Sequence, residues 1–174
     1  YTDQSFELAP RLMLYKDMPM EIMQSNPQQK SFYWGRNEPI EYKVNGLKIK
    51  GFLCYPSNFK VGVKYPMVVH LYERQFAYIN DYVNPSLLTE DGFNVTNVIN
   101  NGYFVLYPDI VYDYGNLAES VTKSVLSAVD AVVDKGDVDS KRVAIIGHSF
   151  GGYEVDLIIT QTDRFATAVA GAAW

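Results

Sequence analysis

Residues 141–161 place a serine, flanked by glycines, between two apolar segments of different periodicity. The stretch reads KRVAIIGHSFGGYEVDLIITQ, with Ser149 near its centre. The run before the serine is typical of a buried strand, and the run after it is typical of a helix. A G-x-S-x-G pattern in this setting predicts a sharp turn, between a strand ending near Ile146 and a helix starting near Gly151, that exposes a nucleophilic hydroxyl. The alternative is a serine that only caps the helix.

Strand-like and helix-like segments alternate along the chain from residue 40 onward. Asn45-Gly46 separates two alternating runs and predicts an antiparallel hairpin. Valines at helical spacing, followed by a glycine stop, make 117–136 the clearest helix. This alternation predicts an α/β fold with a mostly parallel sheet and a leading antiparallel hairpin. The expected strands are 40–44, 47–55, 67–72, 103–109, 142–147 and 165–174, and the expected helices are 93–102, 117–136 and 152–163.

The overall charge and the cysteine count exclude several classes of protein. The 174 residues carry a formal net charge of −5 and a pI near 5.0, which argues against binding to nucleic acid or to an anionic membrane. No apolar run is long enough to span a bilayer. Cys54 is the single cysteine, so neither an internal disulfide nor a multi-cysteine metal site can form. Asp134, Asp137 and Asp139 lack the spacing of a calcium loop and are expected in a solvated turn.

Residues 1–36 differ in character from the segments that follow. They mix short apolar alternations at Leu12 and Leu14 with polar stretches interrupted by proline. The letters QSNPQQKS offer few groups to bury and are typical of a connector. We therefore expect a short strand and a linker here rather than a domain. Because the chain starts at Tyr1 without a signal-like segment, we expect it to be a piece of a longer precursor.

The segment around the serine resembles a known family. The letters VDSKRVAIIGHSFGGYEVDLIITQTDRFATAVAGAA are similar to the nucleophile region of the prolyl oligopeptidase family of serine peptidases. Upstream, KYPMVVHLYERQ and NGYFVLYPDIVYDYG stand where that family has its oxyanion-side strand and the next strand. The resemblance covers roughly residues 30–174. It implies that residues 37–174 are the N-terminal part of an α/β-hydrolase domain, and that residues 1–36 are a linker and the remnant of a preceding β-propeller.

The resemblance assigns roles to three residues at the expected turn and beside it. Ser149 matches the nucleophile, Tyr72 matches the tyrosine whose hydroxyl completes the oxyanion hole, and Phe150 would donate its backbone N–H to the same oxyanion. A phenol suits that role, since it donates one directed hydrogen bond and stays neutral at pH 7. The chain departs from the family where Glu73-Arg74-Gln75 replaces the usual Gly-Gly-Pro. Substrate preference therefore stays open.

A catalytic serine also needs a histidine base and an acid that orients it. No histidine follows Ser149 in this sequence. In the resembled family both partners lie well beyond the strand that 165–174 begins, so we expect the triad Asp and His outside this chain. His148 shares the serine turn and His70 lies within a strand, and neither is expected to act as the base. Asp156 and Asp163, on the helix and at its end, are not expected to be the acid.

The function implied by the resemblance is hydrolysis of peptide bonds, in short peptides, through an acyl-enzyme on Ser149. No cofactor or metal is implied, and the expected partner is a peptide substrate rather than nucleic acid or a membrane. Two alternatives stay open, a carboxylesterase on the same scaffold and a catalytically inactive fragment or interaction module. By family resemblance alone the setting is periplasmic or secreted. The chain by itself is expected to be nearly inactive and to self-associate through the apolar edge at 165–174.

Overall fold

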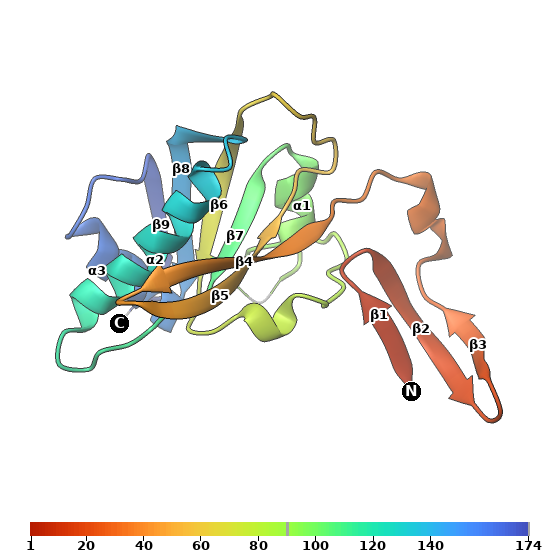
Figure 1. Ribbon diagram of the computed structural model, residues 1–174. Helices are drawn as coiled ribbons and strands as arrows, with labels where there is room; N and C mark the ends of the chain where they lie inside the picture. The colour runs from red at the N-terminus through yellow and green to blue at the C-terminus, as the bar shows by residue number, and fades with distance from the viewer. Residues whose placement is uncertain (90, 174) are drawn as a thin grey trace.

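The computed structural model describes residues 1–89 and 91–173, which form two β-sheets lying side by side (Figure 1). The small N-terminal sheet has the strand order β1-β2-β3 and the large sheet the order β4-β5-β7-β6-β8-β9. The strands are β1 (Thr2–Ser5), β2 (Leu8–Tyr15), β3 (Pro19–Gln24), β4 (Asn37–Val44), β5 (Leu47–Cys54), β6 (Tyr65–Leu71), β7 (Phe104–Pro108), β8 (Val138–His148) and β9 (Thr167–Gly171).

The large sheet confirms the predicted fold class. β4 and β5 form the expected antiparallel hairpin, in which Asn45 and Gly46 both adopt the positive φ angles of a tight hairpin turn, 51° and 81°. β5 also pairs antiparallel with β7, whereas β7, β6, β8 and β9 run parallel to one another. In parallel neighbours the carboxyl ends of the strands meet at one edge of the sheet, and this edge is where ligands bind in open α/β folds.

Within residues 1–89 and 91–173, three α-helices and two short 3₁₀ turns accompany the strands. They are α1 (Val95–Asn100), α2 (Leu117–Val133), α3 (Phe150–Ile159), η1 (Pro27–Ser31) and η2 (Phe76–Tyr78). α2 and α3 cover one face of the large sheet and α1 packs on the other face. Alternate residues of β5 show this division, because Leu53 packs toward α2 while Phe52 packs toward α1. The three α-helices were expected from the sequence, and the structure confirms them.

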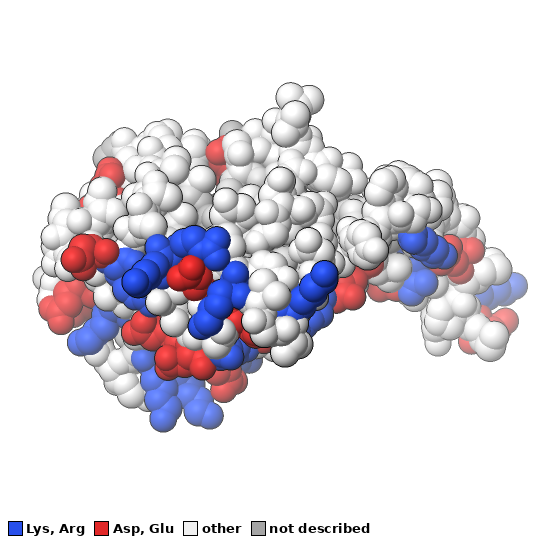
Figure 2. Space-filling model, turned by 90° about the horizontal axis from the view of Figure 1, so that it is seen from above, with Lys and Arg blue, Asp and Glu red and all other residues white. Residues whose placement is uncertain are grey.

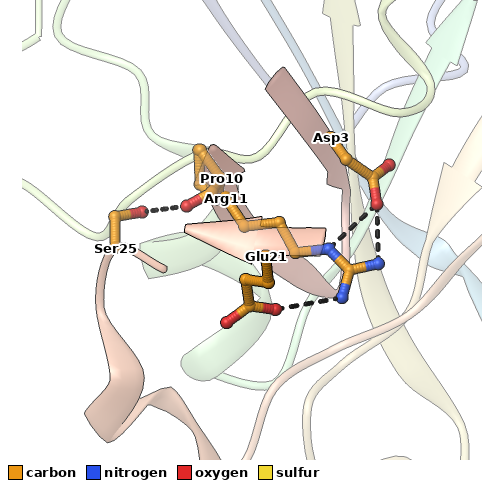
Figure 3. A network of polar contacts seen from close by, with 5 residues as sticks. All are labelled: Asp3, Pro10, Arg11, Glu21 and Ser25. Atoms are coloured by element: carbon orange, nitrogen blue, oxygen red, sulfur yellow. Dashed lines mark hydrogen bonds and ion pairs between the residues drawn. The ribbon is translucent and has the colours of Figure 1, made fainter. Parts of the chain in front are cut away.

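The N-terminal residues contain more regular structure than the single strand expected from the sequence. β1, β2 and β3 form an antiparallel sheet whose side chains are largely exposed. Figure 3 shows one polar network that ties it together. The guanidinium of Arg11 on β2 donates to Asp3 on β1 at 2.7 and 2.9 Å and to Glu21 on β3 at 3.3 Å. β1 is polar throughout and carries no apolar pattern, whereas the apolar side chains of β3, Met20 and Ile22 among them, lie exposed and form no core face.

The small sheet is attached to the large domain through the turn between β1 and β2. Phe6 in that turn is buried against Phe52 and Ile99, on the α1 side of the large sheet. The indole N–H of Trp34 donates to the carbonyl of Phe6 at 2.8 Å, and its ring stacks on Tyr82 with centroids 5.2 Å apart. The N-terminal segment therefore contacts the large domain at Phe6 and around Trp34, whereas most residues of β3 and η1 stay exposed.

The surface is uneven in charge and in burial. Figure 2 shows acidic and basic side chains next to one another over part of the face in view, and a broad area without charged side chains. β9 is an edge strand of the large sheet, and most of its residues are exposed. No described helix is long and apolar enough to cross a membrane.

Candidate active site

Ser149 lies between β8 and α3, as the sequence predicts. Its backbone angles are φ 56° and ψ −121°, so it belongs neither to the strand nor to the helix. β8 continues to His148 and α3 starts at Phe150, each close to the expected boundary. The side chain of Ser149 makes no capping hydrogen bond to the helix. Its hydroxyl is therefore not engaged in the role that the alternative interpretation assigned to it.

Glycines allow the chain to close this turn. A Cβ atom on Gly147 would lie 2.2 Å from the carbonyl oxygen of Gly151, and one on Gly151 would lie 2.1 Å from the carbonyl oxygen of Leu71. The Ser149 N–H donates to the carbonyl of Gly171 at 2.8 Å, which ties the turn to β9. A non-glycine residue with positive φ persists only when its surroundings fix it, and here three backbone segments do so.

Tyr72 lies at the same edge of the sheet as Ser149. β6 and β8 are parallel neighbours with Leu71 opposite Gly147, so the residues that follow each strand emerge side by side. The Tyr72 ring lies near the first turn of α3, because its Cδ2 would be 3.5 Å from a Cβ on Gly151. Tyr72 is 45% exposed, and it lines with Ser149 a cleft of about 740 Å³. Strand order therefore brings these two predicted residues to one cleft.

Phe150 is the first residue of α3. The first N–H groups of a helix have no acceptor within the helix, and the helix dipole makes this end a favourable place for negative charge. The backbone N–H of Phe150 is one of these groups, and it lies directly after Ser149 in the chain. Whether it and the Tyr72 hydroxyl converge on one oxyanion stays a prediction.

His70 forms part of the cleft wall and is held by Gln75. The Gln75 side-chain amide donates to the His70 carbonyl at 2.9 Å, which turns its oxygen toward His70 Nδ1 at 3.0 Å. This orientation requires the proton on Nδ1. Nε2 lies 3.6 Å from an Asp91 carboxylate oxygen. Burial lowers the pKa of His70, while Gln75 and Asp91 act to raise it. His70 is thus a partly buried strand residue whose ring is hydrogen-bonded to Gln75, as expected.

Asp109 fixes the loop that follows Tyr72, and the sequence did not reveal it as part of the site. Its Oδ1 accepts from the backbone N–H groups of Gln75 at 2.7 Å and Phe76 at 2.9 Å. The Ile110 N–H donates to the carbonyl of Glu73 at 3.0 Å. Asp109 directly follows β7, the other parallel neighbour of β6. Its place after a buried strand was the one signal that could have pointed to it.

The remaining predicted residues lie away from the cleft or on its rim. Asp156 and Asp163 are exposed, on α3 and after it, where they cannot orient a base in the cleft. His148 is exposed, with its ring against Gly171 on β9. Asp139, from the predicted acidic turn, lies near the start of β8 and pairs with Arg142 at 2.7 Å.

Relatives of known class share this region of sequence. Residues 93–174 match the sequence model of the prolyl oligopeptidase family. YuxL, described as an uncharacterised peptidase of Bacillus subtilis (strain 168), is 27% identical over 140 residues, covering 76% of this chain and 21% of that protein. The acylamino-acid-releasing enzyme of Sus scrofa is 28% identical over 137 residues, covering 77% of this chain and 17% of that enzyme. The chain spans about a fifth of the length of these relatives.

Solved peptidases have the same fold over nearly the whole chain. The acylaminoacyl peptidase of Pyrococcus horikoshii superposes with a TM-score of 0.78 at 17% identity, covering 99% of this chain and 29% of that chain. Dipeptidyl peptidase 4 of Porphyromonas gingivalis gives a TM-score of 0.74 at 16% identity, covering 99% of this chain and 26% of that chain. At such low identity the likeness concerns architecture, and it confirms the predicted α/β fold.

Proposed function

Because the chain is a member of the prolyl oligopeptidase family of serine hydrolases, we propose that it supplies the nucleophile and the oxyanion site of an enzyme that cleaves short peptides. The observation that carries the proposal is the Ser149 turn. Its hydroxyl is free of any capping bond and lines an open cleft together with Tyr72. The relatives described as a peptidase and an acylamino-acid-releasing enzyme favour amide substrates over esters.

The proposed reaction follows acyl-transfer chemistry. The Oγ atom of Ser149 attacks the substrate carbonyl while the base takes its proton, and the new negative charge forms on the carbonyl oxygen. The C–N bond then breaks, the amine leaves with that proton, and water hydrolyses the acyl-enzyme. The Tyr72 hydroxyl and the Phe150 N–H would both donate to the charged carbonyl oxygen. Donors held in place before the reaction stabilise the transition state without reorganising.

The proposal requires a base and an acid from elsewhere in the polypeptide. In α/β-hydrolases the chain order is serine, acid, histidine. No histidine follows Ser149 within residues 1–174, and the nitrogen Nδ1 of His70 is already bonded to Gln75. We therefore propose that both partners follow residue 174 in the complete enzyme, and that residues 1–36 lead from a preceding β-propeller.

The decisive experiment replaces the nucleophile. We expect Ser149→Ala, in the longest natural polypeptide that contains residues 1–174, to lower kcat on chromogenic peptide amides by roughly 10⁴-fold or more, because no acyl-enzyme can form. A fluorophosphonate probe should label the unmodified enzyme and fail to label the variant.

Ser140→Ala is the matched control, since Ser140 is an exposed serine on the same strand. It should leave both turnover and labelling unchanged. Turnover of esters but not of amides would favour the carboxylesterase alternative. Peptide cleavage that survives Ser149→Ala would refute the proposed function.

A further inference from the structure

A carboxylic acid is buried beneath the candidate oxyanion site. Glu154 lies one helical turn after Phe150 on α3, and its side chain has no exposed surface. Its neighbours on this helix face, Val155 and Ile158, are apolar core residues. Burying a carboxyl group is unfavourable unless it is hydrogen-bonded, so a polar residue here needs a specific reason.

The carboxyl group of Glu154 faces two elements outside its own helix. The Tyr112 hydroxyl, from the segment between β7 and α2, donates to Oε1 at 2.5 Å. The Tyr112 ring also lies against the Phe150 ring, with centroids 6.0 Å apart. The backbone N–H of Glu73 faces the same carboxyl and favours its charged form. Among the residues that the structure describes, Oε2 has no partner within ordinary hydrogen-bond limits.

Glu73 directly follows Tyr72 and has a left-handed backbone, with φ 43°. Its carbonyl accepts from the Ile110 N–H at 3.0 Å, so the segment that carries Tyr112, the hydroxyl partner of Glu154, also holds Glu73. A non-glycine residue in this conformation is kept there by its surroundings. The direction in which Tyr72 leaves β6 therefore depends on groups packed beneath the turn.

We propose that Glu154 is a positioning residue that fixes the Tyr72–Glu73 turn relative to the start of α3, and thereby the Tyr72 hydroxyl relative to the Phe150 N–H. This inference rests on the proposed function. A carboxylate at position 154 accepts from the Tyr112 hydroxyl and also attracts the Glu73 N–H. A protonated carboxyl or an amide at this position would instead turn a donor toward one of these two donor groups.

Electrostatics supports the arrangement. Burial raises the pKa of Glu154 to about 7, and the nearby Glu73 carboxylate acts in the same direction. The hydrogen bond from the Tyr112 hydroxyl and the nearby Glu73 backbone N–H act in the opposite direction and favour the carboxylate. Among the residues that the structure describes, Tyr112 and Glu73 are the titratable groups that act on Glu154. A group tuned in this way near a cleft is typical of a functional site.

A double-mutant cycle tests the proposal, with Glu154→Gln and Tyr72→Phe made singly and together in the longest natural polypeptide that contains the chain. We expect Glu154→Gln to lower kcat for a chromogenic peptide about tenfold and to change KM less than about twofold, since an oxyanion donor acts in the transition state. In the Tyr72→Phe background the same change should alter kcat less than about twofold, because the donor that it positions is already absent.

Asp156→Asn, on the exposed side of α3, is the matched control and should leave kcat unchanged. An equal loss of kcat in both Tyr72 backgrounds, or no loss in either, would overturn the proposal. If Glu154→Gln fails to fold in a thermal melt, Tyr112→Phe removes the hydroxyl partner instead and should show the same dependence on Tyr72. Activity that survives Ser149→Ala would instead refute the proposed function, so the two failures are distinguishable.

Discussion

Gly151 determines how closely α3 approaches β6. The carbonyl oxygen of Leu71 occupies the space that a Cβ atom on residue 151 would need, at 2.1 Å from that position. Because Leu71 precedes Tyr72 and Gly151 follows Phe150, this one contact sets the spacing of the two backbone segments that carry the proposed oxyanion donors. The glycine is required here for space, since its φ angle is not among the positive ones.

We expect Gly151→Ala to destabilise the protein by about 2 kcal/mol or more, because two backbone segments must separate to admit the methyl group. The same separation should slow labelling of Ser149 by a fluorophosphonate probe. Urea melts and labelling rates measure the two effects. Gly115→Ala is the control, since a Cβ there meets nothing closer than 3.4 Å. Unchanged stability and labelling in Gly151→Ala would contradict the close packing described.

Glu154 also predicts a dependence of stability on pH. Its pKa is raised from 4.5 to about 7 in the folded state, so between these values the folded protein binds more protons than the unfolded chain. The free energy of unfolding should therefore fall, by at most about 3 kcal/mol in total, as the pH rises through this window. Above the window it should level off. The free energy of unfolding from urea melts between pH 5 and 8 measures the slope.

Glu154→Gln should flatten that slope, because the amide does not titrate. The lowered pKa of His70 acts with the opposite sign, since its contribution is lost as the pH falls below 6.5 toward its folded value. This contribution is common to both proteins and cancels in the comparison. An identical slope in the two would show that Glu154 keeps an ordinary pKa.

At the scale of elements, the sequence predicts what apolar periodicity and turn chemistry encode. α2 follows from valines at helical spacing, and the β4–β5 hairpin follows from Asn45-Gly46. β8 begins at Val138, earlier than expected, because polar residues at its start still pair in the sheet, with Val138 opposite Tyr65. The sheet of β1 to β3 buries few of its side chains, so its apolar residues, such as Leu14 and Met20, do not mark a core face.

The candidate site divides in the same way. Ser149 follows from a local motif, and Tyr72 from the family resemblance together with the expected strand order. Asp109 and Glu154 act through contacts between elements far apart in the chain, and the bond from Tyr112 to Glu154 spans 42 residues. A single sequence carries no signal for such contacts. Glu154 even has the spacing of a core residue, which hides its polar role.

For the whole molecule, the unpaired side of β9 is the most consequential surface. An edge strand presents unpaired N–H and C=O groups that can pair with another strand. Val169 on this strand is 52% exposed, and Ala144 and Ile146 on neighbouring β8 are only partly buried. The relatives are several times longer than this chain, so they have further polypeptide with which to cover a surface of this kind.

The 174-residue chain by itself should self-associate and be nearly inactive. Pairing at the β9 edge explains the association, and Val169→Lys should weaken it, because a charge on an edge strand opposes pairing. Without an oriented base, catalysis should fall to the roughly 10³ to 10⁴-fold over water that oxyanion donors and binding alone supply, or below it.

Light scattering coupled to size exclusion gives the mass in solution, and Val61→Lys, at a residue 89% exposed in a loop, is the matched control. A monomer whose Ser149-dependent turnover equals that of the longer polypeptide would mean that the base lies within residues 1–174. His70 would then be the residue to reconsider, because it already lines the Ser149 cleft with Asp91 beside its Nε2.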